Sequence, residues 1–174
     1  MVDSELPWGP AAALQSVSVE VRQGDASGRV HSLRTTALGG GTGRRALPLA
    51  VGLLPPEEES GAAVWIEVRG CATPDGCALG EAVVVQRAVV RFVAEQTLEV
   101  PMLLASACVG ARCTEDQRCV PTTGECEEAR RAPVTAYNGP RTLVGADATV
   151  RADVLDAGES EDRPDVGRAA ICRM

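Results

Sequence analysis

The cysteines are the residues whose type and spacing carry the most chemistry. The chain of 174 residues has seven of them, and Cys108, Cys113, Cys119 and Cys126 fall within one short stretch. Four, five and six residues separate these neighbours, and most of them are polar or Gly and Pro residues typical of loops. A segment without enough apolar residues for a core needs a covalent or metal cross-link to become ordered. The stretch therefore predicts either disulfides or a metal site.

The spacing favours disulfides over zinc. Structural zinc sites use cysteine pairs a few residues apart, so that one tight turn offers both thiolates to the ion. Of the three gaps only that between Cys108 and Cys113 fits this pattern, and no histidine lies nearby. Four cysteines allow three pairings. We favour a crossed arrangement, Cys108 with Cys119 and Cys113 with Cys126. A cytosolic zinc-binding adaptor is the alternative.

Cys71 and Cys77 form a second local pair. Pro74-Asp75-Gly76 between them is turn chemistry, so a disulfide here would close the end of a hairpin. Two buried free thiols are the alternative. Cys172 is the odd cysteine, and we expect it to be a free thiol. We expect the chain to be a truncated or frame-shifted copy of a longer protein whose next module would hold the partner of Cys172.

Other reactive residues do not form a catalytic set. His31 is the only histidine and is expected at the surface beside Ser32. The glycine-rich stretch 39–43 lacks the lysine of a phosphate-binding loop. We therefore predict no catalytic residue, cofactor or metal ligand. A cell-envelope hydrolase with catalytic groups on the loops between strands is the alternative.

Several segments alternate between apolar and polar residues, as half-buried strands do. In 15–22, for example, Val17, Val19 and Val21 would share one face. The stretch 46–53 alternates too, but Pro48 makes it an expected edge strand. The stretch 81–93 is rich in valine, so we expect at least part of it to be buried on both faces, or a bulge to shift its register. The remaining predicted strands are 30–36, 63–69 and 98–104.

About six such strands without an amphipathic helix predict an all-β fold. We expect an antiparallel β-sandwich of the immunoglobulin or fibronectin type III kind. It would span residues 14–107, after an N-terminal lead of residues 1–13. A cystine-rich module, 108–126, would follow. Residues 127–174 are expected to be an acidic, mostly disordered tail, because their composition buries too little apolar surface.

Composition limits the partners and the compartment. A net charge of −7 and 2% aromatic residues argue against nucleic-acid binding. No apolar run is long enough for a transmembrane segment. Dense cysteines in disulfides indicate an oxidising, extracytoplasmic space. The residues from Met1 to Glu5 are not a signal peptide, so we expect the leader to be absent from this chain.

One short motif carries a resemblance. Cys108 to Cys113, followed by Cys119 and by Gly124-Glu125-Cys126, resembles the small cystine module of exported bacterial surface lipoproteins. In that group a β-rich domain precedes the module and an acidic linker follows it. The resemblance implies a cell-surface or periplasmic location. It leads us to expect a non-catalytic interaction or spacer module whose partner is an unidentified protein or glycan.

Overall fold

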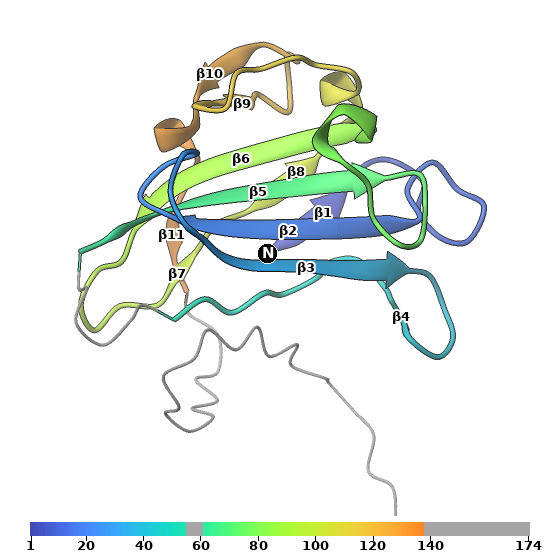
Figure 1. Cartoon of the computed structure of the whole chain (residues 1–174), viewed down its shortest axis with the longest axis horizontal. Coiled ribbons are helices and arrows are strands. Elements are labelled where there is room, and N and C mark those ends of the chain that lie inside the picture. The colour runs from blue at the N-terminus through green and yellow to red at the C-terminus, as the bar shows by residue number, and fades with distance from the viewer. Residues whose placement is uncertain (55–60, 138–174) are drawn as a thin grey trace, which may run out of the picture.

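The main element of the computed structural model is a five-stranded sheet with the strand order β4-β3-β2-β5-β6 (Figure 1). The structure describes residues 1–54 and 61–137. The strands of this sheet are β2 (Ser16–Gln23), β3 (Val30–Leu38), β4 (Arg44–Arg45), β5 (Ala63–Cys71) and β6 (Val84–Arg91). Within the described residues there is no α-helix, and the predicted all-β class is confirmed.

Three two-stranded pairs accompany the main sheet. They join β1 (Val2–Ser4) to β8 (Met102–Leu104), β7 (Leu98–Glu99) to β11 (Thr135–Ala136), and β9 (Gln117–Cys119) to β10 (Cys126–Glu128). Short 3-10 turns are η1 (Leu79–Glu81), η2 (Ser106–Cys108) and η3 (Ala129–Arg131). The prediction of a wholly antiparallel arrangement is wrong, because β1 with β8 and β3 with β4 pair in parallel. The alternation of apolar and polar residues predicts which face of a strand is buried. It does not predict whether the neighbouring strand runs parallel or antiparallel to it.

The core lies against one face of the main sheet. Val17, Val19 and Val21 of β2 share this face, as their spacing predicts, and each is less than a tenth exposed. Leu104 of β8 and Val2 of β1 belong to the same buried cluster. The second face of the sheet carries the polar residues of the same strands, and it is this face that positions the candidate site.

The predicted edge strand at 46–53 is not a strand. Its apolar residues still turn toward the core, but Pro48 has no N–H and interrupts the ladder. Leu49 alone exchanges backbone hydrogen bonds with Val2, at 2.8 Å in each direction. Period-two alternation therefore correctly predicted which side of this segment is buried. It did not predict that only Leu49 forms backbone hydrogen bonds of the sheet type.

Other predicted boundaries shift in the structure. The long stretch 81–93 begins in η1 and becomes a strand only at Val84. Its middle part is buried on both faces as expected, since Ala88 faces the core and Arg87 is buried on the polar side. Residues 1–13 contain β1, with Val2 only 3% exposed. Residues 127–137 contain η3 and β11, whereas the rest of the expected tail, with Cys172, lies outside the described residues.

Candidate functional site

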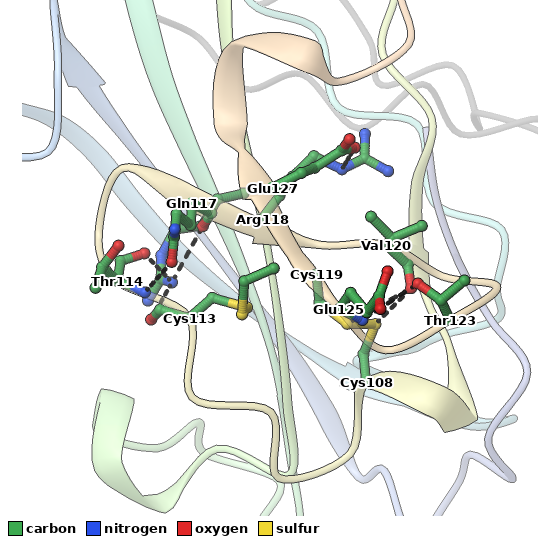
Figure 2. The surroundings of a disulfide bond; sticks show 12 residues. Cys108, Cys113, Thr114, Gln117, Arg118, Cys119, Val120, Thr123, Glu125 and Glu127 are labelled. Carbon is green, nitrogen blue, oxygen red and sulfur yellow. Dashed lines mark hydrogen bonds and ion pairs between the residues drawn. A yellow bond between two sulfur atoms is a disulfide. The ribbon is translucent and has the colours of Figure 1, made fainter.

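Three disulfides cross-link the loops around the sheet. The sulfur atoms of Cys71 and Cys77 are bonded, and the second cluster is paired as Cys108–Cys119 and Cys113–Cys126 (Figure 2). These are the six cysteines, and the crossed pairing, that the sequence favoured. The zinc-binding alternative would need the same sulfurs as thiolates. Among residues 1–54 and 61–137 no group of His, Cys, Asp and Glu is arranged to hold a metal ion.

The Cys71–Cys77 loop folds back over the polar face of the sheet. The Ser16 hydroxyl donates to the carbonyl oxygen of Thr73 at 2.7 Å, which holds the loop down. Gly76 sits directly over Ser18 and Thr35: a Cβ at this position would lie 2.9 Å from each hydroxyl oxygen. Its φ of +91° also favours glycine. The turn residue is therefore required both by backbone conformation and by close packing.

The segment 108–126 lies along the β6 edge of the sheet. Cys108 and Cys119 are 1% and 2% exposed and belong to the same apolar cluster as the valines of the sheet. The Gln86 side-chain amide donates to the carbonyl oxygen of Cys119 at 2.8 Å. The cystine-rich segment thus shares the core of the main sheet, and it covers an edge that would otherwise be open to pairing.

Arg87 fastens the cystine-rich segment from the polar face. Its guanidinium donates to three backbone carbonyl oxygens, those of Cys113 at 3.2 Å, Thr114 at 3.0 Å and Gln117 at 3.4 Å. All three carbonyl oxygens lie around Nη1, so one charged donor holds them together and fixes the path of the loop.

Five charged side chains run in a line across the polar face, and we call them the arginine–glutamate ladder. Its members, in spatial order across β2, β5 and β6, are Arg22, Glu20, Arg69, Glu67 and Arg87. Arg22 Nη2 lies 2.6 Å from Glu20 Oε1. Arg69 pairs with both glutamates, and its Nε lies 2.6 Å from Glu67 Oε1. Arg87 Nε lies 2.7 Å from Glu67 Oε2.

The ladder is held out of water at its centre. The side chains of Glu20 and Glu67 are 6% and 1% exposed, and both oxygens of each carboxylate accept from arginine. A buried ion pair that loses one partner typically leaves a costly uncompensated charge. Both oxygens of each carboxylate are therefore occupied by arginine donors, so the ladder offers no free acid or base. Through Arg87 it holds the cystine-rich segment against the sheet.

His31 and Ser32 do not come together. They are consecutive residues of β3, but the β2–β3 register shifts here, so that Ser32 and Val30 have partners in β2 and His31 does not. Their side chains form no hydrogen bond with each other in the described part of the chain. His31 is exposed. The pair therefore lacks the mutual contact that a hydroxyl nucleophile and its base require.

The ladder is the feature that sequence reasoning missed, although a signal for it exists. Glu-Val-Arg occurs twice, as 20–22 and 67–69, each time with its charged residues at the positions that alternate with core valines. Glu20 and Glu67 are opposite each other in the β2–β5 register. Two like charges in that position require cations beside them, and the two arginines of the repeat supply these.

No family model, curated protein or solved structure matches this chain. The fold and the site define a class only in structural terms: a disulfide-linked β protein whose loops are fixed to one charged sheet face. Within the described residues no helix is long and apolar enough to cross a membrane.

Proposed function

We propose that this chain is a non-catalytic interaction or spacer module that works outside the cytoplasm, in the periplasm or on the cell surface. The observation that carries the proposal is the set of three disulfides. Disulfides persist in oxidising compartments and are rare where cytosolic thiols keep cysteines reduced. The cysteine chemistry of this chain is therefore that of an exported protein.

Rigidity supports the interaction or spacer role. The Cys71–Cys77 loop is tied to the sheet by its disulfide and by the hydrogen bond from Ser16. The cystine-rich segment is closed on itself by two disulfides and is held to the sheet by hydrogen bonds such as those from Arg87. A surface fixed in this way loses little conformational entropy when a partner binds. Such a scaffold suits holding or presenting a protein or glycan ligand more than it suits bond-making chemistry.

Two finer points belong to the same proposal. The first is that the chain is related in layout to exported bacterial surface lipoproteins, on the strength of the motif ending in Gly124-Glu125-Cys126. The second is that the main sheet and its smaller strand pairs form a sandwich of the immunoglobulin or fibronectin type. The apolar face of the sheet, with β1 and β8 in its core cluster, supports the sandwich.

The test is the intact mass of protein made in an oxidising compartment, measured without reductant and then after reduction. We expect reduction to add the hydrogens of three disulfides, and purification to release no stoichiometric metal. An unchanged mass with bound zinc that a chelator removes would overturn the extracytoplasmic proposal. Turnover of ester, peptide or glycan substrates that is lost in a His31→Ala variant would overturn the non-catalytic one.

A further inference from the structure

Two cysteines that belong to different disulfides face each other in the cystine-rich segment. Cys119 of β9 and Cys126 of β10 are directly opposite in the antiparallel register of these two strands. Cys119 is bonded to Cys108. Cys126 is bonded to Cys113. The two crossed disulfides are therefore neighbours across one pair of strands.

A backbone hydrogen bond beside this cysteine pair shows how closely the two residues approach. The N–H of Val120 donates to the carbonyl oxygen of Glu125 at 2.8 Å. Hydrogen-bonded and non-hydrogen-bonded positions alternate along an antiparallel pair, so Cys119 and Cys126 occupy a non-hydrogen-bonded position. Opposite residues there have Cα atoms about 4.5 Å apart and side chains on the same face. A disulfide accepts Cα separations of about 4.4–6.8 Å, so a Cys119–Cys126 bond would fit these strands.

The two crossed disulfides differ in their access to solvent. Cys108 and Cys119 are 1% and 2% exposed. Cys126 is exposed and Cys113 is half-buried. Thiol–disulfide exchange requires a thiolate to reach one of the bonded sulfur atoms. A reductant in solution can therefore attack at Cys126, whereas the buried disulfide is reached most directly by a thiolate of the protein itself.

We propose that the Cys113–Cys126 disulfide is a redox site that controls the pairing of the buried cysteines. A protein dithiol outside the cytoplasm opens this bond, and the thiolate of Cys126 then attacks the sulfur atom of Cys119. The Cys119–Cys126 bond forms and the Cys108–Cys119 bond breaks. The proposal rests on the extracytoplasmic role above, because it requires all three disulfides to be present at the start.

Atoms and electrons balance in both steps. In the first step, one thiolate of the dithiol bonds to the Cys126 sulfur and Cys113 leaves as a thiolate. The second thiol of the dithiol then displaces Cys126, so the dithiol becomes a disulfide and its two electrons and two protons pass to Cys113 and Cys126. The second step is electron-neutral, because Cys126 gives up its thiolate and Cys108 leaves as a thiolate that takes up a proton.

The exchange loosens one side of the cystine-rich segment. In the native pairing residues 113–119 lie within the loops of both crossed disulfides. After the exchange the remaining bond closes only residues 119–126, and residues 109–118 have no covalent cross-link. Hydrogen bonds such as those from Arg87 to the carbonyl oxygens of Cys113 and Thr114 then hold this stretch to the sheet. The redox state would thus change the surface that the segment presents.

The third disulfide provides an internal control. Cys71 lies opposite Ser16 in the register of β5 with β2, and no cysteine of β6 pairs with β5. Opening the Cys71–Cys77 bond therefore brings no thiolate beside another disulfide. Its reduction should give two thiols and no new pairing.

The test uses the full chain with Cys172→Ser, which keeps the seventh cysteine out of the exchange. Dithiothreitol is added in small molar excess, and thiols are trapped with N-ethylmaleimide in denaturant at low pH. In protein that keeps Cys71–Cys77 and has lost one disulfide, we expect peptide mapping to find the Cys119–Cys126 bond. The trapped thiols should be those of Cys108 and Cys113.

Hydrogen exchange of the same partly reduced protein measures the loosening. Amides of residues 109–118 should exchange faster than in the protein with three disulfides. Amides of β2, which the crossed disulfides do not close, should be unchanged.

A matched pair of variants isolates the geometry without any reductant. Cys113→Ser leaves the thiol of Cys126, which faces Cys119. Cys126→Ser removes the same disulfide but leaves the thiol of Cys113, which lies outside the strand pair. Trapping should label Cys108 at least about tenfold more in Cys113→Ser, because only there is the attacking sulfur held beside Cys119.

Two results would overturn the exchange. The first is singly reduced protein that keeps the Cys108–Cys119 bond and carries its thiols at Cys113 and Cys126. The second is equal labelling of Cys108 in the two variants. If neither variant folds, the mapping of the partly reduced protein decides the question. Three disulfides without exchange leave the extracytoplasmic role standing, whereas a protein whose mass shows no disulfide overturns that role.

Discussion

The indole N–H of Trp65 donates to the carbonyl oxygen of Glu115 at 3.0 Å, which joins a central strand of the sheet to the cystine-rich segment. Trp65 is only 3% exposed. The Arg22 guanidinium carbon lies 5.2 Å from the centroid of its ring. One side chain therefore anchors the loop through its donor and supports the end of the arginine–glutamate ladder through its ring face.

Replacing Trp65 with Phe should lower the free energy of unfolding by about 2 kcal/mol, because the hydrogen bond to Glu115 is lost and the smaller ring leaves a gap in a buried position. The local effect is more specific. Amide exchange should accelerate between Cys113 and Gln117, and it should be unchanged in the Cys71–Cys77 loop. Equal acceleration in both loops would show that Trp65 contributes general packing and no particular anchor.

Replacing Glu67 with Gln should be among the most damaging conservative changes. Glu67 accepts from both Arg69 and Arg87, and its side chain is 1% exposed. Its neutralisation leaves two buried cations with too few partners, for which we expect a loss of about 3–5 kcal/mol in denaturant unfolding. Arg87 should also hold the loop carbonyls less firmly.

The matched control is Glu127→Gln in β10. Glu127 Oε1 lies 3.3 Å from Arg118 Nε, but the Glu127 side chain is 31% exposed and the contact lacks hydrogen-bond geometry (Figure 2). The Arg118 side chain is only 9% exposed, but the contact is long and water reaches Glu127, so we expect a cost of about 1 kcal/mol, well below that at Glu67. A cost at Glu127 as large as that at Glu67 would mean that burial does not set the strength of these pairs.

The two crossed disulfides should differ in how much they stabilise the protein. Their sequence separations are 11 and 13 residues, so the loop-closure contributions are nearly equal, at about 3 kcal/mol each. Cys108–Cys119 is buried in the core, whereas Cys126 is exposed. Alanine at both positions of the buried pair should cost about 1–2 kcal/mol more, because it also leaves a cavity. Denaturant unfolding of the two double variants measures the difference.

The β2–β3 turn should contribute an acid-sensitive part of the stability. Hydrogen bonds from the hydroxyl and the N–H of Ser27 lower the pKa of Asp25 below its ordinary value of 3.8. A carboxyl whose pKa is lower in the folded state stabilises that state above the unfolded pKa, and the stabilisation is lost as pH falls through the folded pKa. The Asp25→Asn variant should therefore show a shallower fall in melting temperature below about pH 4.

Nuclear magnetic resonance titration of the Asp25 carboxyl carbon measures the shift directly. The control is Asp75→Asn, an exposed carboxyl in another turn. If Asp25 and Asp75 variants have the same acid profile, the Ser27 hydrogen bonds do not favour the ionised form.

The sequence was sufficient for features that depend on near neighbours. Alternation placed Val17 and Val19 on the core face, because period two is a property of the extended chain itself. The local clustering of cysteines left few pairings, and the crossed one required no long loop. At 46–53 the alternation reported which side of the segment is buried, but the edge strand predicted there does not form.

Only the tertiary structure decided what covers the other face. Glu20 has the sequence pattern of a solvent-facing residue, yet it is buried and paired with Arg69, which is 49 residues away. Alternation reports the polarity of a face, but burial depends on whether distant loops fold over it. Here the strand register sets two glutamates opposite each other, arginines neutralise them, and disulfide-bonded loops exclude the water. Each of these conditions depends on residues far apart in the sequence. Hydrophobic periodicity, which compares near neighbours, therefore cannot predict them.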